Sequence, residues 1–300
     1  MKPLVFINAD YAALELRTLA QVCLFLFGQS RLAEVLNAGE DPHLTIACTL
    51  LGIPYAEAFA LNEAHDPVVD AARQTGKIAN FGYAGALGSD KLVLFARKSY
   101  RVNLTVEQAK QLKRQWLATF PEMRKYFEYI NSLQGPDGAT FRHFVSGRMR
   151  GGVSYTATAN SFFQALGADA NGAVLFDLAE SCYTPVACQW CAGSCNGCVW
   201  CRPGMPGVSP LYGARLVNHV HDDNLVECEE ERSHEAAHTL SKVMVDGVRP
   251  YLPDVPAIAK PCISRWWSKD ARQVWAPDET SAIKDKNGKG QRLMPWPKAA

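Results

Sequence analysis

The stretch Leu4-Val5-Phe6-Ile7-Asn8-Ala9-Asp10-Tyr11 decides the fold that we expect for this chain of 300 residues. Residues 4–8 are mainly apolar and predict a buried strand that leads to Asp10. From Ala12 to about Phe27 the apolar residues have helical spacing. A carboxylate at the end of a buried strand is held rigidly and stays open to solvent, which suits a magnesium ligand.

A second carboxylate site lies in the segment from Ala214 to Glu227, which predicts two short strands around a tight turn at Asp222-Asp223. Mg²⁺ usually takes one or two protein carboxylates plus substrate phosphates. Two such ions about 4 Å apart can activate an attacking hydroxyl and stabilise the leaving oxygens. Taken alone, these aspartates are better explained as ordinary strand-end and turn residues. The sequence motifs around the two positions therefore have to decide between a magnesium site and ordinary structural residues.

A helix predicted over residues 66–87 carries Arg73, Lys77 and Phe81 at four-residue intervals. Such residues drift by only about 40° per step and therefore share one helix face. That face suits a nucleoside triphosphate, because arginine offers the phosphates a planar fork and lysine offers a point charge. The aromatic ring can then pack on the sugar. The alternative is a solvated basic edge with Phe81 in the core.

The remaining pattern is mainly helical. Thr105-Val-Glu-Gln108 fits the capping-box pattern and predicts the start of a helix. Further helices are predicted after Pro121, over 156–178 and over 232–248. Residues 134–152 are rich in turn-forming residues and predict turns.

Five motifs, in the same order along the chain, resemble the signatures of family A DNA polymerases. They extend over about residues 4–270, and chance does not explain five matches in order. The motifs are Asp10-Tyr-Ala-Ala-Leu-Glu15-Leu-Arg17, Glu40-Asp41-Pro42-His43, Arg73-x3-Lys77-x3-Phe81-Gly82, Asn160-x3-Gln164 with Ala168-Asp169, and Val220-His221-Asp222-Asp223.

The resemblance implies an α+β fold with a polymerase palm, which contains an antiparallel sheet, and an inserted helical fingers domain. It implies transfer of a deoxynucleotide from a triphosphate to a primer 3′-hydroxyl on a DNA template, with two Mg²⁺ ions at Asp10 and Asp222. The implied domains are palm at 1–18 and 153–275, fingers at 19–152, a Cys-rich insertion at 182–210 and a tail at 276–300.

The resemblance also implies domains that we do not expect in this chain, namely a thumb and an exonuclease. Much of the grip on duplex DNA comes from phosphate contacts, and the thumb supplies many of them. We therefore expect either weak, distributive DNA binding or a second polypeptide that supplies the thumb, with or without an exonuclease. A split polymerase is the preferred interpretation.

Individual roles follow from the resemblance. Glu15 is implied to be a steric gate against a ribose 2′-hydroxyl, because a bulky side chain fills the space that the wrong sugar needs. Lys77 is implied to be the general acid for the pyrophosphate leaving group, and Phe81 in place of tyrosine implies poor acceptance of chain terminators. The other implied contacts are those of Arg73, Lys77, Phe81, His43 and Tyr11 with the nucleotide, and of Asn160, Gln164 and His221 with the primer–template. Amide side chains suit the acceptors of the minor groove, whereas a lone histidine is more often structural.

The chain departs from the family pattern at several positions. Gly85 occupies the place of the tyrosine on which the template base stacks, and Tyr83 lies about 160° from Phe81 on a helical wheel. Thr156 replaces an arginine, and Ala12-Ala13 replaces Ser-Gln. The positioning of the template therefore differs from the family pattern.

Six of the ten cysteines lie between Cys182 and Cys201, where the family has a shorter connection. Two Cys-x2-Cys pairs, Cys188/Cys191 and Cys198/Cys201, have the spacing of a tetrahedral zinc site. Cys182 or Cys195 can replace one of these ligands. An iron–sulfur cluster and unligated thiols in a loop are the alternatives.

Composition restricts the possible functions less than the motifs do. The length suggests roughly two domains, and a formal net charge of +1 neither favours nor excludes nucleic acid. No membrane span and no signal peptide are expected, which favours the cytoplasm of a bacterium or of an infected host cell. A non-catalytic subunit that only binds DNA or a protein partner is the rival function, and the presence of Asp10, Asp222 and Lys77 argues against it.

Overall fold

The computed structural model describes residues 2–194, 201–202 and 204–267. The chain divides into two compact units. The sheet unit comprises Met1–Leu14, Ala168–Tyr251 and Ala257–Ala300, and the helical unit comprises Glu15–Gly167 and Leu252–Pro256.

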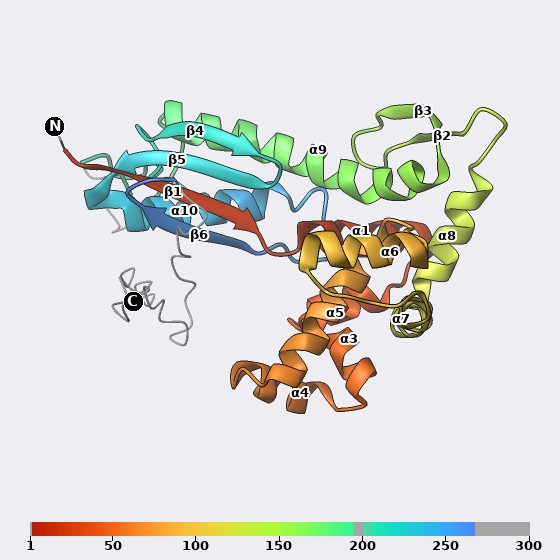
Figure 1. Ribbon diagram of the computed structural model, residues 1–300. Helices are drawn as coiled ribbons and strands as arrows, with labels where there is room; N and C mark the ends of the chain where they lie inside the picture. The colour runs from red at the N-terminus through yellow and green to blue at the C-terminus, as the bar shows by residue number, and fades with distance from the viewer. Residues whose placement is uncertain (1, 195–200, 203, 268–300) are drawn as a thin grey trace. The chain divides into compact units, whose positions relative to one another are not determined.

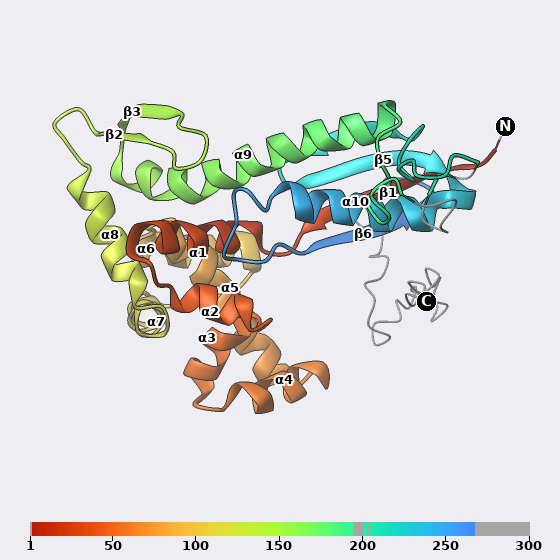
Figure 2. The ribbon, with the colours of Figure 1, turned by 180° about the vertical axis from the view of Figure 1, so that it is seen from behind.

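The sheet unit is built on a four-stranded antiparallel sheet with the strand order β4-β5-β1-β6 (Figure 1). Side chains of β1 are alternately buried, and its buried residues include Val5, Ile7 and Ala9. The helix α10, Ser233–Gly247, lies along one face of the sheet (Figures 1 and 2). The strands are β1, Leu4–Tyr11; β4, Arg215–Val220; β5, Asp223–Glu229; and β6, Ala259–Ser264, and a 3₁₀ turn, Glu230–Arg232, follows β5.

The first strand, the hairpin and an α+β fold with an antiparallel sheet were expected from the sequence, and the structure confirms them. The hairpin turn comprises His221 and Asp222, one residue earlier than predicted, because Val220 pairs with Asp223. The strand β6 was not expected. It is an edge strand that contains Pro261, a residue that central strands exclude and that hides the strand pattern.

The helical unit contains a series of short helices. Side chains cap several of them: Asp41 accepts from the His43 amide at the start of α3, and Asp66 accepts from two amides at the start of α5. The predicted capping box of Thr105 and Gln108 is present at the start of α7. The helices are α1, Leu14–Phe27; α2, Arg31–Asn37; α3, Pro42–Leu51; α4, Tyr55–Glu63; α5, Pro67–Ala84; α6, Ser89–Phe95; a π-helical turn, Ala96–Tyr100; α7, Val106–Thr119; and α8, Glu122–Ser132.

The turn-rich segment at 134–152 contains a two-stranded hairpin whose strands were not predicted, with β2 at Ala139–Arg142 and β3 at Met149–Val153. Four of the five residues of β3 are exposed, so the strand lacks the alternation that marks a half-buried strand. The long helix α9, Tyr155–Tyr183, follows this hairpin. Its residues up to Gly167 belong to the helical unit and the others to the sheet unit.

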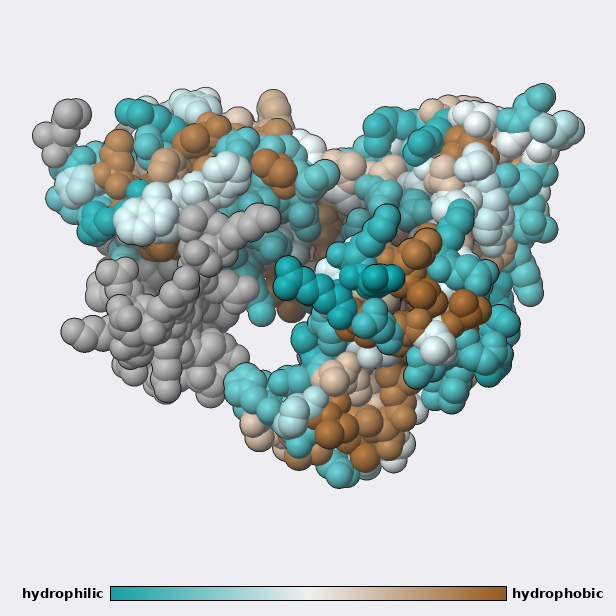
Figure 3. All heavy atoms as spheres, in the orientation of Figure 1, coloured by the Kyte–Doolittle hydropathy of each residue, from teal (hydrophilic) through white to brown (hydrophobic). Residues whose placement is uncertain are grey.

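A small apolar core holds α3, α4 and α5 together. Leu44 and Ala47 of α3, Ala58 of α4 and Val69 of α5 are buried against one another. Apolar residues also gather on the surface over α4, in the lower part of Figure 3, where Phe59 is 50% exposed. This core fixes α3 beside α5, which places the residues of two sequence motifs next to each other.

Among the described residues no single helix is long and apolar enough to cross a membrane; α3 and α4, bent by 109°, pass that test only as a pair, by length and composition.

Candidate functional site

Three aspartates lie at the same end of the sheet. The ladder between β1 and β5 runs to Ala9 opposite Asn224, so Asp10 and Asp223 follow at the same end, beside the turn that carries Asp222. Burial and the negative charges of Asp222 and Asp223 raise the pKa of Asp10 to about 6, and Lys260, its partner on β6, opposes this shift. A group of carboxylates that repel one another offers hard oxygen ligands and fits Mg²⁺.

Two buried asparagines, Asn171 and Asn224, form a chain of hydrogen bonds that supports the turn between β4 and β5. His221 has a left-handed backbone (φ 59°), and its carbonyl accepts from Nδ2 of Asn171 on α9 at 2.6 Å. Oδ1 of Asn171 accepts from Nδ2 of Asn224 at 3.2 Å, and Oδ1 of Asn224 lies 3.1 Å from Nδ1 of His219. The sequence analysis missed Asn171 and Asn224. The available signal was an amide side chain within the apolar pattern of a long helix.

Asp223 is engaged within the sheet. Its carboxylate accepts a hydrogen bond from Nδ2 of Asn8, and Oδ1 of Asn8 lies 3.6 Å from Sγ of Cys262. Burial raises the pKa of Asp223, and the bond from Asn8 opposes the shift. Asp223 therefore has less freedom to bind a ligand at the sheet end.

The side chain of Tyr11 points into the sheet unit. It is 2% exposed, and its hydroxyl donates to the carbonyl of Met244 on α10 at 2.8 Å. Burial raises the pKa of the phenol. The Tyr11 side chain is therefore buried and does not present its ring or hydroxyl to a bound nucleotide.

In the helical unit, the predicted face of α5 gathers around His43. Arg73 pairs with Asp41 through Nη2 at 2.6 Å, and the ring centroids of Phe81 and His43 lie 5.4 Å apart. Burial lowers the pKa of His43 to about 4, with the charges of Arg73 and Lys77 adding to the shift and Asp41 opposing it. Residues from two motifs, about 30 positions apart in the sequence, thus share one site.

A chain of hydrogen bonds fixes the protonation form of His43. Trp116 on α7 can only donate, and its Nε1 donates to Oδ1 of Asn80 at 2.9 Å. Nδ2 of Asn80 therefore faces Nδ1 of His43, at 2.9 Å, and donates to it. His43 is consequently neutral at pH 7, with its proton on Nε2. Asn80 and Trp116 were missed, although Asn80 lies inside the helix motif.

The predicted sugar gate and a predicted primer–template contact lie together in the helical unit. Nε2 of Gln164 on α9 donates to Oε1 of Glu15 on α1 at 3.3 Å, and both side chains are exposed. The pKa of Tyr100 is raised, first by burial and then by the charge of Glu15. The structure thus brings Glu15, Gln164 and Tyr100 into one neighbourhood.

Asn160 occupies the space beside Gly85. Its Nδ2 donates to the carbonyl of Gly85 at 3.1 Å and to that of Thr156 at 2.8 Å. A Cβ at position 85 would lie 2.8 Å from Oδ1 of Asn160. Tyr83 is fully buried, and its hydroxyl donates to the carbonyl of Ala109. Neither position 83 nor position 85 therefore offers an exposed ring for a template base.

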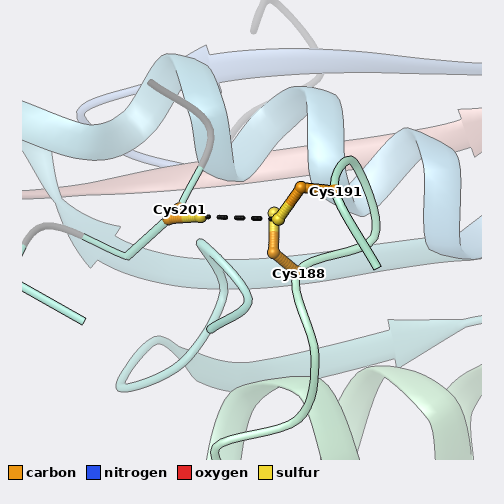
Figure 4. Close-up of side chains that lie close together, drawn as sticks. All are labelled: Cys188, Cys191 and Cys201. Carbon is orange, nitrogen blue, oxygen red and sulfur yellow. Dashed lines mark hydrogen bonds between the residues drawn. The ribbon is translucent and has the colours of Figure 1, made fainter. Parts of the chain in front are cut away.

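Three of the clustered cysteines approach one another. The sulfur atoms of Cys188, Cys191 and Cys201 all lie within 4.8 Å of one another (Figure 4). Cys182 is not a member of this group; burial raises the pKa of its thiol to about 12, and the positive charge of Arg232 opposes this shift. The other predicted ligands, Cys195 and Cys198, lie outside the described residues.

Comparison with known proteins shows that the chain is similar to bacterial DNA polymerases. No family model matches the chain. It is 23% identical over 265 residues to DNA polymerase I of Aquifex aeolicus (strain VF5), covering 88% of this chain and 39% of that protein. It is 25% identical over 246 residues to the thermostable DNA polymerase I of Thermus aquaticus, covering 82% of this chain and 25% of that protein.

A solved structure shares the fold. The POL domain of Pol1 from M. smegmatis, in complex with DNA primer–template and dNTP, matches 87% of this chain and 39% of that chain with a TM-score of 0.61 and 20% identity. The chain thus spans well under half the length of these relatives. The similarity extends over most of the 300 residues and confirms the predicted resemblance to family A polymerases.

Proposed function

We propose that this chain, a relative of bacterial DNA polymerases, adds deoxynucleotides to a primer 3′-hydroxyl under the direction of a DNA template. The observation that carries the proposal is the group of Asp10, Asp222 and Asp223 at one end of an antiparallel sheet, in a chain similar to DNA polymerase I. In this proposal the sheet unit is the palm and the helical unit is the fingers.

Asp10 and Asp222 are the proposed ligands of two Mg²⁺ ions. When bound, these ions would polarise the attacking hydroxyl and the leaving phosphate oxygens. Asp10 presents its carboxylate from the end of a rigid strand, and the turn with Asp222 is held by Asn171. Asp223, engaged by Asn8, has the lesser role.

The face of α5 is the proposed site for the triphosphate. Arg73 and Lys77 supply positive charge to the phosphate oxygens, and Lys77 is the proposed general acid for the leaving pyrophosphate. His43 adds a neutral donor at Nε2, because Asn80 occupies its Nδ1. Phe81, whose ring packs against His43, is the proposed support for the sugar.

The nucleic acid and the sugar complete the proposed contacts. Glu15 is the proposed gate against ribonucleotides, and its bond with Gln164 holds its carboxylate in place. Asn160, Gln164 and His221 are proposed to contact the primer–template. Involvement of a second polypeptide stays a prediction, which processivity measurements with and without co-expressed neighbouring proteins would test.

Incorporation of single nucleotides tests the proposal. Purified protein with Mg²⁺, a primer–template and one dNTP at a time should add only the nucleotide complementary to the template base. Equal incorporation of all four would exclude template direction. Binding of primer–template without any incorporation would instead support the rival function of a non-catalytic DNA-binding subunit.

A further inference from the structure

We propose that Cys188, Cys191 and Cys201 ligate a structural zinc ion, and that this ion fixes the chain segment leading into β4 and thereby the turn that carries Asp222. The proposal goes beyond the polymerase function, and the metal site is expected whether or not the chain extends primers.

The distances between the sulfur atoms fit tetrahedral zinc. Zn–S bonds of about 2.3 Å at tetrahedral angles separate two sulfur atoms by about 3.8 Å. Sγ of Cys191 lies 3.7 Å from Sγ of Cys201, and all three sulfur atoms lie within 4.8 Å of one another. The side chains point toward one another (Figure 4). This spacing leaves room for one ion between the three sulfur atoms.

The backbone around the sulfur atoms is arranged as in a metal-binding loop. The amide of Gly207 donates to Sγ of Cys201 at 3.1 Å, a bond that stabilises a thiolate. Ala187 forms an isolated antiparallel bridge with Val208, which brings the residue before Cys188 beside the segment after Cys201. A Cβ at Gly207 (φ 81°) would lie 2.9 Å from the carbonyl oxygen of Gly193, so the two loops touch backbone to backbone.

Burial argues for a ligand in this cluster. Cys188 is 1% exposed and Cys201 is 5% exposed, so these sulfur atoms lie together out of contact with water. Coordination of a metal by such a group of thiolates stabilises the folded loop. Three thiolates plus one further donor complete a tetrahedral site.

The cysteine loop contacts the helix α10 and the end of the strand β5. Nε1 of Trp190 donates to Oγ1 of Thr239 on α10 at 3.1 Å, and the ammonium of Lys242 lies 5.5 Å from the Trp190 ring centroid. Arg202, next to Cys201, pairs with Glu229 at the end of β5 at 3.6 Å. The buried Arg232 donates to the carbonyls of Pro210 and Tyr212.

Through these contacts, a bound ion stabilises the pairing of β4 with β5. The segment that leaves the cysteine loop enters β4 at Arg215, and β4 ends at Val220, next to the turn with Asp222. Loss of the ion frees the loop from its crosslink and lets the start of β4 separate from β5.

Metal analysis tests the ligand assignment independently of polymerase activity. Protein purified without chelators should contain about one zinc ion per chain. Cys191→Ser and Cys201→Ser should each lose most of this zinc, whereas Cys48→Ser, in α3, should keep it. Cobalt substitution should give the sulfur-to-cobalt charge-transfer band, weakened in the same two variants.

Hydrogen exchange tests the effect on the hairpin, using wild-type protein so that no variant has to fold. Zinc removal by a chelator should speed amide exchange in β4 and restoring zinc should reverse it, while exchange in α3 should not change. Protein without zinc, full zinc in both serine variants, or iron with labile sulfide would overturn the ligand assignment. Unchanged exchange in β4 would overturn the proposed link to the turn.

Discussion

His43 is held in one protonation form by side chains from two other helices, and this arrangement sets what it can offer a phosphate. The Trp116 indole fixes the Asn80 amide, and the amide fills Nδ1 of His43. A neutral histidine with Nε2–H is a donor, so it can bind a phosphate oxygen without adding a third full charge beside Arg73 and Lys77.

Trp116→Phe should therefore weaken nucleotide binding. The variant keeps an aromatic ring in the buried cluster but frees the Asn80 amide to rotate and lose its bond to Nδ1. A lost hydrogen bond of about 1 kcal/mol corresponds to roughly a fivefold rise in the KM for the dNTP, with kcat little changed. Steady-state kinetics with one dNTP measure this. Trp266→Phe, at an exposed position, is the control. An unchanged KM in a folded Trp116→Phe protein would show that the hydrogen-bond chain from Trp116 through Asn80 to His43 does not contribute to nucleotide binding.

Glu15 should govern the choice of sugar. Glu15→Ala opens space next to the proposed sugar position, so the ratio of ribonucleotide to deoxynucleotide incorporation should rise by about tenfold or more, equivalent to about 1.4 kcal/mol. Single-nucleotide kcat/KM values for matched rNTP and dNTP report the ratio. Glu107→Ala, which removes another exposed glutamate from the first turn of a helix, should leave this ratio unchanged. A constant ratio in Glu15→Ala would show that another residue is the gate.

At the scale of elements, close packing of α3 against α5 builds the His43 site. Gly76 lies at the contact, and a Cβ there would collide with the carbonyl oxygen of His43. The four-residue spacing of Arg73, Lys77 and Phe81 predicted that they share one face of α5. It did not predict that Gly76, between Arg73 and Lys77, allows α3 to approach.

Gly76→Ala should destabilise the protein by about 1–3 kcal/mol, because the two helices have to separate to accept the methyl group. The matched control is Gly172→Ala in α9, where a Cβ meets no atom within 4 Å. That change should stabilise by about 0.5–1 kcal/mol through helix propensity. Thermal unfolding followed by circular dichroism compares the two variants. Equal effects of the two substitutions would contradict the packing argument.

Elements with strong local signals could be predicted, and elements defined by long-range pairing could not. The apolar run of β1 and the capping box of α7 were sufficient to place both. The edge strand β6 carries Pro261, and β3 is mostly exposed, so neither shows the strand pattern. The hairpin was predicted, but its turn was shifted by one residue, because pairing with β5 and not turn composition sets the register.

At the scale of the whole molecule, sequence motifs predicted candidate functional residues but not the side chains that hold them. The motifs pointed to Asp10 and Asp222 in the sheet unit and to Lys77 in the helical unit. Motif matching could not find Asn171, which supports the turn from a helix 50 positions away in the sequence. Such partners have no fixed spacing from the motifs, and only the fold brings them together.

The proposed function requires that the carboxylates of Asp10 and Asp222 take part in the chemistry and do not merely bind DNA. Removing one charge while keeping the shape separates these roles, so the informative variants are Asp10→Asn and Asp222→Asn, with Asp223→Asn as a milder comparison. Retained DNA binding, measured by fluorescence anisotropy, is the control for folding.

The most direct measurement is single-turnover incorporation of one complementary dNTP, with protein in large excess over primer–template so that weak DNA binding does not limit the rate. The account predicts rapid addition by the wild type, a loss of about three orders of magnitude or more in Asp10→Asn and Asp222→Asn, equivalent to about 4 kcal/mol, and a smaller loss in Asp223→Asn. Addition by Asp10→Asn or Asp222→Asn at more than a few per cent of the wild-type rate, or no addition by the wild type, would contradict it.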